Sequence, residues 1–277
     1  MNMSLQQEIR TFLKTHHTHL SKKMGQHFLI DPHVLRCSVD AANIQPYDHI
    51  IEIGAGIGTL TREILKNTSH VTAIEADRRL IPLLEEFLIR RVTLSPSKGD
   101  TLTIIQANAL RFSYPETPYK IVANIPYQIT SNLFRTVFRK NKHLPTSLTL
   151  LIQKEVAEKI MGKPERSLLT LLVALHGTPR IIRTVSPGAF LPPPKVESAI
   201  IHIECFPKPL ADEKTLSVLF ELATVAFRKK RKMLRASIGK STRITDALVA
   251  SGIDPTRRPE TLTTDEWLSL AHVSQSH

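Results

Sequence analysis

The sequence predicts an α/β fold with a seven-stranded, mostly parallel sheet and a small all-helical domain at the C-terminal end. Short apolar runs, typical of buried strands, alternate with helix-like segments between residues 50 and 205. The composition changes after Cys205, where Pro207 and Pro209 indicate a stiff connector. With 277 residues, 42% of them hydrophobic, the chain is long enough for one large domain and one small domain.

The individual strands and helices follow from the spacing of apolar residues and from capping signals. Strands are expected at residues 50–53, 71–74, 102–105, 121–123, 148–152, 181–185 and 199–203. Helices of the large domain are expected at 59–66, 80–89, 132–138 and 155–161, and at 32–42 after the N-cap Asp31 and Pro32. Helices of the small domain are expected at 216–238, 245–251 and 265–271, the last after a capping-box spacing at 263–266. Residues 95–100 are expected to form an exposed loop.

We therefore expect one domain at residues 1–205 and a second domain at residues 206–277. Residues 1–23 are polar and basic, which indicates a solvated tail. The tail contains His16-His17-Thr18-His19, a tract that could suggest a metal site. No carboxylate or cysteine ligand accompanies these histidines, so no metal is expected.

The charge of the chain indicates its kind of partner. Lys and Arg total 37 against 25 Asp and Glu, a formal net charge of +12. Such an excess favours a polyanion, either nucleic acid or an anionic membrane surface. Two cysteines without CxxC spacing and an N-terminus without an apolar signal-peptide core indicate a reducing, cytoplasmic location. The longest largely apolar stretch, residues 168–175, is too short to span a bilayer.

A glycine-rich segment, Glu52-Ile53-Gly54-Ala55-Gly56-Ile57-Gly58-Thr59, follows the first strand and opens a helix. Gly54 and Gly56 at such a place let the backbone turn tightly and let a ligand approach it closely. The third glycine comes one residue earlier than in a dinucleotide-binding fingerprint. This spacing suits an adenosine ligand that has no pyrophosphate. The alternative is a purely structural turn.

Polar residues follow the next two strands. Glu75 ends the second strand, where a carboxylate can accept both ribose hydroxyls of a nucleoside. Asn108 follows the third strand, where an amide can hydrogen-bond an adenine edge. A solvent-exposed acid and an ordinary loop Asn are the alternatives. Together with the glycine-rich segment, the two residues predict a cofactor that contains a nucleoside.

The fourth strand ends in Asn124-Ile125-Pro126-Tyr127. Pro126 stops the strand because it has no N–H to donate, and the rigid turn holds Asn124 and Tyr127 close together. The Asn124 side-chain oxygen and the Ile125 carbonyl can accept both N–H bonds of an adenine amine. Its lone pair is then localised for attack on an electrophilic methyl group. Tyr127 can stack on the base. The alternative is a strand-end turn with Tyr127 in the core.

Two further segments favour an RNA substrate. Phe190 begins a proline-rich loop at residues 190–196 and can cover the other face of the base, unless the loop serves packing alone. Residues 226–235 contain six cations, namely Arg228, Lys229, Lys230, Arg231, Lys232 and Arg235. An apolar stripe at helical spacing, formed by Leu219, Leu222, Ala226 and Met233, predicts a helix with a cationic outer face. Such a face suits phosphates, although a simple solvated face is the alternative.

Seven motifs, taken in order, resemble those of the ribosomal RNA adenine dimethyltransferases, the KsgA family, which are relatives of the erythromycin-resistance methylases. They are residues 25–29 (Gly-Gln-His-Phe-Leu), residues 52–58, Glu75, and residues 124–127, 153–157, 190–198 and 228–235. The resemblance extends over residues 22–265. The segment at 190–198 and the basic run look more like the small-subunit branch than the erythromycin-resistance branch.

The resemblance implies a Rossmann-like, S-adenosylmethionine (SAM)-dependent methyltransferase fold. It implies dimethylation of N6 on two adjacent adenosines in the 3′-terminal hairpin of small-subunit (16S) rRNA, during ribosome biogenesis on a pre-30S particle. A monomeric enzyme is expected. The implied SAM contacts are His27, Leu29, Gly54, Glu75, Asn108 and Asn124, to which the glycine-rich segment adds Gly56. Lys22 and Lys23 join the expected RNA contacts.

Three departures from the family pattern stand out. Position 27 is His where Asn is usual, and Ala107-Asn108 replaces the usual Gly-Asp. Residues 165–169 (Glu-Arg-Ser-Leu-Leu) stand where a Tyr-Gly-Arg-Leu-Ser-like stretch is common. The alternatives to the main hypothesis are a large-subunit rRNA methylase, a non-catalytic RNA-binding assembly factor and an NAD-dependent enzyme. The intact turn at 124–127 disfavours loss of catalysis, and the early third glycine disfavours NAD.

Overall fold

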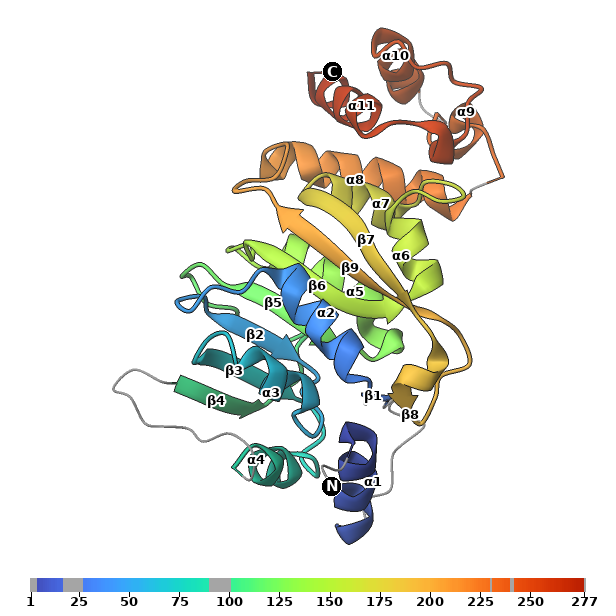
Figure 1. Ribbon diagram of the computed structural model, residues 1–277. Helices are drawn as coiled ribbons and strands as arrows, with labels where there is room; N and C mark the ends of the chain where they lie inside the picture. The colour runs from blue at the N-terminus through green and yellow to red at the C-terminus, as the bar shows by residue number, and fades with distance from the viewer. Residues whose placement is uncertain (1–3, 17–26, 90–100, 230, 240–241, 277) are drawn as a thin grey trace. The chain divides into compact units, whose positions relative to one another are not determined.

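The computed structural model describes residues 4–16, 27–89, 101–229, 231–239 and 242–276 (Figure 1). These residues form two compact units. The first comprises Met1–Ala157 and Arg180–Cys205, and the second comprises Glu158–Pro179 and Phe206–His277. The loop expected at residues 95–100 lies outside the described residues. In the parts of the chain that are described, no helix is both long and apolar enough to cross a membrane.

A seven-stranded sheet with the order β4-β3-β2-β5-β6-β9-β7 forms the centre of the first unit (Figure 1). Its strands are β2 (Ile50–Ile53), β3 (His70–Glu75), β4 (Thr101–Gln106), β5 (Lys120–Asn124), β6 (Ser147–Gln153), β7 (Gly177–Val185) and β9 (Ser198–Cys205). Strands β2 to β6 pair in parallel, whereas β9 pairs antiparallel with β6. This topology confirms the predicted α/β fold with a mostly parallel seven-stranded sheet. The sequence could predict it because strands covered on both faces are nearly continuous apolar runs.

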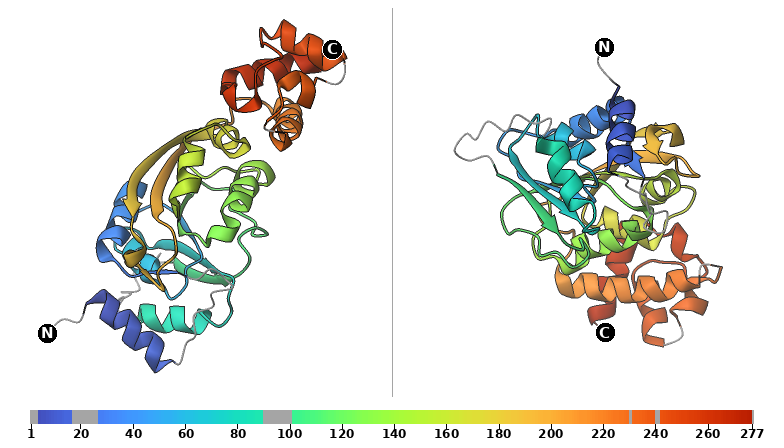
Figure 2. Two further views of the ribbon diagram at one scale, coloured as in Figure 1. Left: turned by 90° about the vertical axis from the view of Figure 1, so that its right-hand side faces the viewer. Right: turned by 90° about the horizontal axis from the view of Figure 1, so that it is seen from below.

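Helices cover both faces of this sheet. They are α2 (Pro32–Ala42), α3 (Thr59–Ile64), α4 (Ile81–Ile89), α5 (Thr130–Arg135), the π-helical turn η3 (Thr136–Lys140) and α6 (Lys154–Ile160). Figures 1 and 2 show α2 and α5 on opposite faces. The start of α2 follows the predicted signals, since the Asp31 carboxylate accepts the N–H groups of His33 and Val34 and Pro32 is the first helical residue.

The chain order reverses next to β2, which places the functional edge of the sheet. Strands β3 and β4 lie to one side of β2, and β5 and β6 lie to the other. The register pairs Ile53 with Ile74 of β3 and with Ala123 of β5, so the carboxyl ends of the three strands lie together. In open α/β sheets, ligands bind outside the carboxyl ends of strands at such a switch point.

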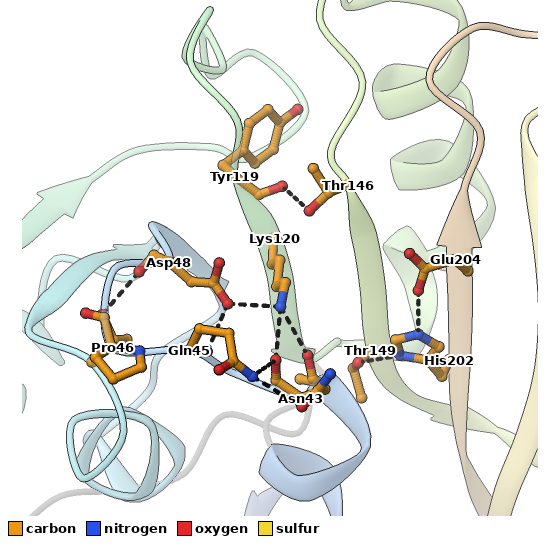
Figure 3. A network of polar contacts seen from close by, with 12 residues as sticks. Asn43, Gln45, Pro46, Asp48, Tyr119, Lys120, Thr146, Thr149, His202 and Glu204 are labelled. Atoms are coloured by element: carbon orange, nitrogen blue, oxygen red, sulfur yellow. Dashed lines mark hydrogen bonds and ion pairs between the residues drawn. The ribbon is translucent and has the colours of Figure 1, made fainter.

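The opposite, amino edge of β2 and β5 is closed by a polar network (Figure 3). Lys120, the first residue of β5, forms an ion pair with Asp48 at 2.7 Å and donates to the Asn43 carbonyl at 2.8 Å. Asp48 also accepts the N–H of Gln45 at 2.7 Å. Both charged side chains are about one-sixth exposed. The network joins the end of α2 to the starts of two central strands.

Residues 4–16 are not part of the solvated tail that the polar composition of residues 1–23 indicates. Helix α1 (Leu5–Thr15) begins with a capping box between Ser4 and Gln7. Its residues Ile9, Phe12 and Leu13 are buried. The ring of Phe12 packs edge-on against Phe87 of α4 at 5.3 Å, as the neighbouring positions of the two helices in Figures 1 and 2 also show. The helical spacing of these few apolar residues was the signal for α1.

The chain also forms a small sheet that the sequence interpretation missed. Strand β1 (Phe28–Leu29) pairs antiparallel with β8 (Phe190–Leu191). Two-residue strands leave almost no periodic signal in a sequence. The pairing joins Phe28 to Leu191 and Leu29 to Phe190, residues that are far apart in the sequence.

The second unit is built from helices. They are α7 (Leu168–Ala174), α8 (Glu213–Arg228), α9 (Leu234–Ser237), α10 (Thr242–Ala250) and α11 (Thr264–Ser276). The predicted capping box at the start of α11 is present, since Thr263 and Glu266 exchange hydrogen bonds. Residues 158–179, assigned to the first domain from sequence, belong to this unit because Leu171 and Leu175 of its α7 region pack in the same apolar cluster as Trp267.

The long helix expected at residues 216–238 is two helices. Helix α8 ends at Arg228, and Lys229 leaves helical geometry with φ −119° and ψ 45°. The N–H groups of Leu234 and Arg235 then donate to the carbonyls of Arg257 and Pro255 instead of continuing a helix. Adjacent cations at helical spacing repel each other, which disfavours a continuous helix here. Met233, expected on the packed stripe, is 41% exposed.

Candidate active site

A cavity of about 360 Å³ opens at the carboxyl edge of the sheet. It is lined by residues that follow β2, β3, β4 and β5, together with His27 and Phe28. Six residues expected to contact a cofactor line it, namely His27, Gly54, Gly56, Glu75, Asn108 and Asn124. The turn residues Ile125, Pro126 and Tyr127 line it as well. The structure therefore brings the sequence-predicted positions from four separate segments into one cavity.

The glycine-rich segment lies against the strand beside it. The N–H groups of Gly54 and Ala55 both donate to the Ile74 carbonyl, at 2.8 and 3.2 Å. Gly56 has a φ of 61°, and a Cβ on it would lie 2.7 Å from the Phe28 ring. Both features exclude a side chain at position 56. Phe28 thus packs directly on the glycine backbone at the wall of the cavity.

Glu75 is held by the glycine segment from one side and by its own loop from the other. Its Oε2 accepts the Gly56 N–H at 2.8 Å, and its Oε1 accepts the Asp77 N–H at 2.8 Å. Burial raises the pKa of Glu75, and these two N–H donors act against the rise. A carboxylate oxygen has two acceptor positions, so each oxygen keeps one for a ligand in the cavity. Glu75 is thereby fixed as a two-oxygen acceptor.

Asn124 ends β5 with a defined amide orientation. Its Nδ2 donates to the His27 carbonyl at 2.9 Å. Because the amide nitrogen is engaged, the Oδ1 atom is the group that remains to accept a hydrogen bond. The adjacent Ile125 N–H donates to the Leu151 carbonyl at 3.2 Å, which extends the pairing of β5 and β6 beyond the strand end. The backbone that carries this acceptor is therefore rigid.

His27 and Tyr127 lie against each other at the cavity. Their ring centroids are 5.8 Å apart with an interplanar angle of 23°. His27 Nδ1 is 2.7 Å from the Pro192 carbonyl oxygen, which requires a proton on Nδ1. The Tyr127 hydroxyl is hydrogen-bonded to the Ser198 hydroxyl at 2.6 Å, and burial raises the pKa of Tyr127. Pro192, which follows β8, and Ser198, the first residue of β9, thus hold the His27 and Tyr127 side chains in place. The sequence interpretation missed this role.

Asn108 lines the cavity in an Asx turn. Its Oδ1 accepts the Leu110 N–H at 2.9 Å. The Nδ2 group is therefore the one available to a ligand at this position, as a donor. An Asp here, as the family pattern has it, would offer only acceptors. The departure at position 108 thus changes the hydrogen-bonding character of this wall.

Two predicted site residues lie elsewhere. Leu29 and Phe190 pair in the small sheet, are 1% and 2% exposed, and pack in one apolar cluster with α2. Neither lines the cavity. The expectation that Phe190 covers a base is not met in this structure, because its ring fills the core. The apolar wall is made instead by residues such as Phe28 and Leu80, neither of which was predicted as a site residue.

The predicted RNA contacts that the structure describes belong to the second unit, whereas the cavity belongs to the first. Arg228, Arg231, Lys232 and Arg235 are exposed, and Lys229 is partly buried. All five belong to the second unit, at the end of α8, in the following turn and in α9. Lys22, Lys23 and Lys230 lie outside the described residues.

The combination of sheet and cavity defines a class of protein. A glycine turn after β2, a two-oxygen acceptor after β3 and a polar turn after β5 meet at the switch point of a parallel sheet. This is the arrangement of a Rossmann-like enzyme that binds a nucleoside-containing ligand. The early third glycine separates it from the dinucleotide-binding dehydrogenases.

The chain belongs to the ribosomal RNA adenine dimethylase family, whose model matches residues 17–276. This confirms the family that the motifs indicated. The chain is 36% identical over 259 residues to ribosomal RNA small subunit methyltransferase A of Alkaliphilus metalliredigens, covering 90% of each chain. It is 37% identical over 280 residues to the protein of that name from Dehalococcoides mccartyi, covering 96% of this chain and 92% of the relative.

Two solved structures have the same fold. The 23S rRNA methyltransferase ErmE superposes with a TM-score of 0.71 at 25% identity, covering 90% of this chain and 99% of ErmE. A dimethyladenosine transferase from Plasmodium falciparum superposes with a TM-score of 0.72 at 24% identity, covering 88% of this chain and 96% of that chain. These likenesses support the Rossmann-like methyltransferase fold.

Proposed function

We propose that the protein is a SAM-dependent RNA adenine-N6 dimethyltransferase that modifies two adjacent adenosines in the 3′-terminal hairpin of small-subunit rRNA. The observation that carries this proposal is the orientation of Asn124. Its amide nitrogen is bound to the His27 carbonyl, so its oxygen remains as an acceptor at the cavity that also holds Glu75. One cavity thus holds a hydrogen-bond acceptor for the cofactor, Glu75, and one for the target amine, Asn124.

The residues present fit SAM. Glu75 keeps one acceptor position on each oxygen and would bind the two ribose hydroxyls. The backbone at Gly54 and Gly56, which lines the cavity, would lie along the cofactor, and Asn108 Nδ2 would donate to a ring nitrogen of its adenine. The bound cofactor supplies an electrophilic methyl group on a sulfonium sulfur. The positive charge of the sulfonium group suits a cavity that is lined by the Glu75 carboxyl group.

The turn at residues 124–127 would act on the target base. The Asn124 Oδ1 and the Ile125 carbonyl would accept the two N–H bonds of the adenine amine. This arrangement localises the nitrogen lone pair out of the ring and directs it at the methyl group. After transfer, the nitrogen loses a proton to solvent, and a second cycle adds the second methyl group. Tyr127, fixed by Ser198 and His27, would stack on the base.

The curated relatives support the small-subunit branch. Two of them, both named ribosomal RNA small subunit methyltransferase A, are 36–37% identical to this chain over at least 90% of its length. We further propose that the enzyme acts as a monomer on a pre-30S particle in the cytoplasm. The net charge of +12 and the exposed cations of the second unit support binding of such a polyanionic substrate.

The direct test is mass spectrometry of rRNA from methylation-deficient small-subunit particles incubated with the protein and SAM. We expect two adjacent N6,N6-dimethyladenosines in a 3′-terminal fragment of the small-subunit rRNA. Large-subunit particles in a parallel reaction should remain unmodified. Methylation of large-subunit rRNA instead would favour the erythromycin-resistance activity, and no methylation of either would leave the non-catalytic assembly role.

A further inference from the structure

A second cavity, of about 270 Å³, lies in the first unit. One wall is the segment that follows β4, residues 110–116, and the other is the end of η3 with residues 141–143. Leu110 lines both this cavity and the active-site cavity. The two cavities are therefore neighbours on one unit. We call the second one the flanking cavity.

The walls of the flanking cavity carry an excess of positive charge. Arg111, Lys140 and Lys142 line it and are exposed. Within the described part of the chain, none of the three has a carboxylate partner. The acidic residue of the lining, Glu116, has an 87% exposed side chain and lies 3.9 Å from His143. Three unpaired cations around one hollow favour an anionic ligand.

The flanking cavity also presents an aromatic ring on a rigid support. Phe112 is partly exposed and packs edge-to-face on the buried Tyr114, with ring centroids 5.3 Å apart at 86°. Across the cavity, Asn141 donates to the Tyr119 hydroxyl at 2.7 Å and also to the His143 carbonyl. The π-helical turn η3 ends at Lys140, and such turns often occur at functional sites. An ordered ring beside cations suits a nucleobase and its phosphate.

We propose that the flanking cavity binds a nucleotide of the RNA substrate other than the target adenosine. Arg111, Lys140 and Lys142 bind its phosphates, and Phe112 stacks on its base. This inference rests on the proposed function, since it assigns a second RNA contact to the same reaction. The shared residue Leu110 places the flanking cavity directly beside the active-site cavity. Phe112 favours RNA over an acidic protein segment, which would need the cations alone.

The charge contribution is tested with R111E/K140E/K142E. Binding of a hairpin RNA is measured over a range of salt concentrations, and SAM binding is measured by calorimetry. We expect RNA affinity to fall at least about tenfold and the slope of log affinity against log salt to shrink by about 2, as for three lost phosphate contacts. SAM affinity should be unchanged, which also shows that the variant is folded.

The matched control is R36E/R180E/R183E, which reverses three exposed cations of the same unit that line neither cavity. It should weaken RNA binding clearly less than R111E/K140E/K142E. An equal loss in both variants would attribute the effect to net charge and overturn the proposal. Unchanged RNA binding together with weaker binding of whole particles would indicate an acidic protein partner and would also overturn it.

The base contact is tested with Phe112→Ala and Phe112→Trp. Phe112→Ala should lower RNA affinity about tenfold without changing the salt slope, because stacking involves no counterion release. Phe112→Trp should restore most of the affinity. Equal binding by all three proteins would overturn the stacking role. If the wild-type protein methylates rRNA while these variants behave like it, only the flanking cavity is refuted, whereas an inactive wild type would refute the proposed function itself.

Discussion

The amino and carboxyl edges of the central strands carry similar polar residues, but these residues have different roles at the two edges. At the amino edge, the Lys120 ammonium group contacts the Asp48 carboxylate at 2.7 Å and the Asn43 carbonyl at 2.8 Å (Figure 3). At the carboxyl edge, the Asn124 amide nitrogen donates to the His27 carbonyl, and the Glu75 oxygens accept the N–H groups of Gly56 and Asp77. The remaining oxygen positions of Asn124 and Glu75 face a cavity. The amino edge therefore stabilises the fold, and the carboxyl edge is organised to bind.

The difference shows what makes a polar strand end functional. Both edges have charged or amide side chains, and both anchor them through hydrogen bonds to the backbone. At the carboxyl edge the anchoring contacts fix an orientation without using up the acceptors, which preorganises them for a ligand. Variants at the two edges should consequently separate catalysis and binding from stability.

The largest effect is expected for Asn124→Ala. Losing the oriented acceptor should lower turnover about a hundredfold or more, since comparable losses of one preorganised hydrogen bond cost 10²–10³ in rate. SAM binding should weaken only several-fold, because Glu75 and the glycine segment remain. Transfer of a tritiated methyl group to small-subunit particles, with calorimetry of SAM binding, measures both.

The matched control for this variant is Asn132→Ala, which removes an exposed amide from α5. It should keep turnover within about twofold of wild type. A wild-type methylation rate in Asn124→Ala would show that the turn at residues 124–127 does not direct the amine. A variant that is inactive yet restores particle assembly in a deletion strain would point to a binding role beside catalysis.

At the same edge, Glu75→Ala should act on cofactor binding. Because we propose that this carboxylate binds two hydroxyls, its removal should weaken SAM affinity about 10- to 100-fold, in line with hydrogen bonds to charged groups. Turnover at saturating SAM should fall much less. Calorimetric titration measures the affinity, with Glu85→Ala, an exposed acid on α4, as the control. Unchanged affinity in Glu75→Ala would refute its role as the ribose acceptor.

Much of this carboxyl edge was predictable because its residues stand at strand ends. Gly54, Glu75, Asn108 and Asn124 each follow an apolar run, and parallel strands bring such positions together. Leu29 and Phe190 were misplaced because a two-residue strand pair, which gives no periodic signal, buries both side chains in the core. Long-range contacts such as that between His27 and Pro192 depend on the same pairing, and local sequence does not encode them.

The polar network at the amino edge, in contrast, could not be predicted from the sequence. Lys120 and Asp48 are far apart in sequence, and each alone is an ordinary charge next to a strand. At the basic run of residues 228–235, the sequence predicted more regular structure than is present. Its apolar stripe predicted one helix, whereas repulsion between its cations and hydrogen bonds from residues 234 and 235 to the loop at 255–257 divide it.

At the amino edge, Lys120→Met should reduce stability without reducing turnover. It leaves the Asp48 carboxylate and the Asn43 carbonyl without their cation in a largely buried setting. We expect a loss of about 2 kcal/mol in the free energy of unfolding, measured with urea. Lys66→Met breaks an exposed pair with Glu63 and should cost less than about 1 kcal/mol. A selective loss of turnover in Lys120→Met would contradict the division between the edges.

Between the two edges, Glu52 lies within β2 and is 1% exposed. Its Oε2 makes no hydrogen bond within the described residues. Burial, and to a lesser extent the charge of Glu75, raises the pKa of Glu52 from 4.5 to about 8. Between these two pH values the folded chain keeps a proton that the unfolded chain releases. Stability from this group is therefore complete below pH 4.5 and is lost as the pH rises towards 8.

The variant Glu52→Gln isolates this contribution, because an amide has no charge to bury. From pH 5.5 to 7.5 the wild type should lose about 1 kcal/mol of unfolding free energy per pH unit relative to the variant, and above pH 8 the difference should level off. Urea unfolding across this range measures it, with Glu85→Gln as the exposed control. Parallel curves for wild type and Glu52→Gln would mean that β2 carries an ionised Glu52. The polar character of the carboxyl edge would then extend into the strand.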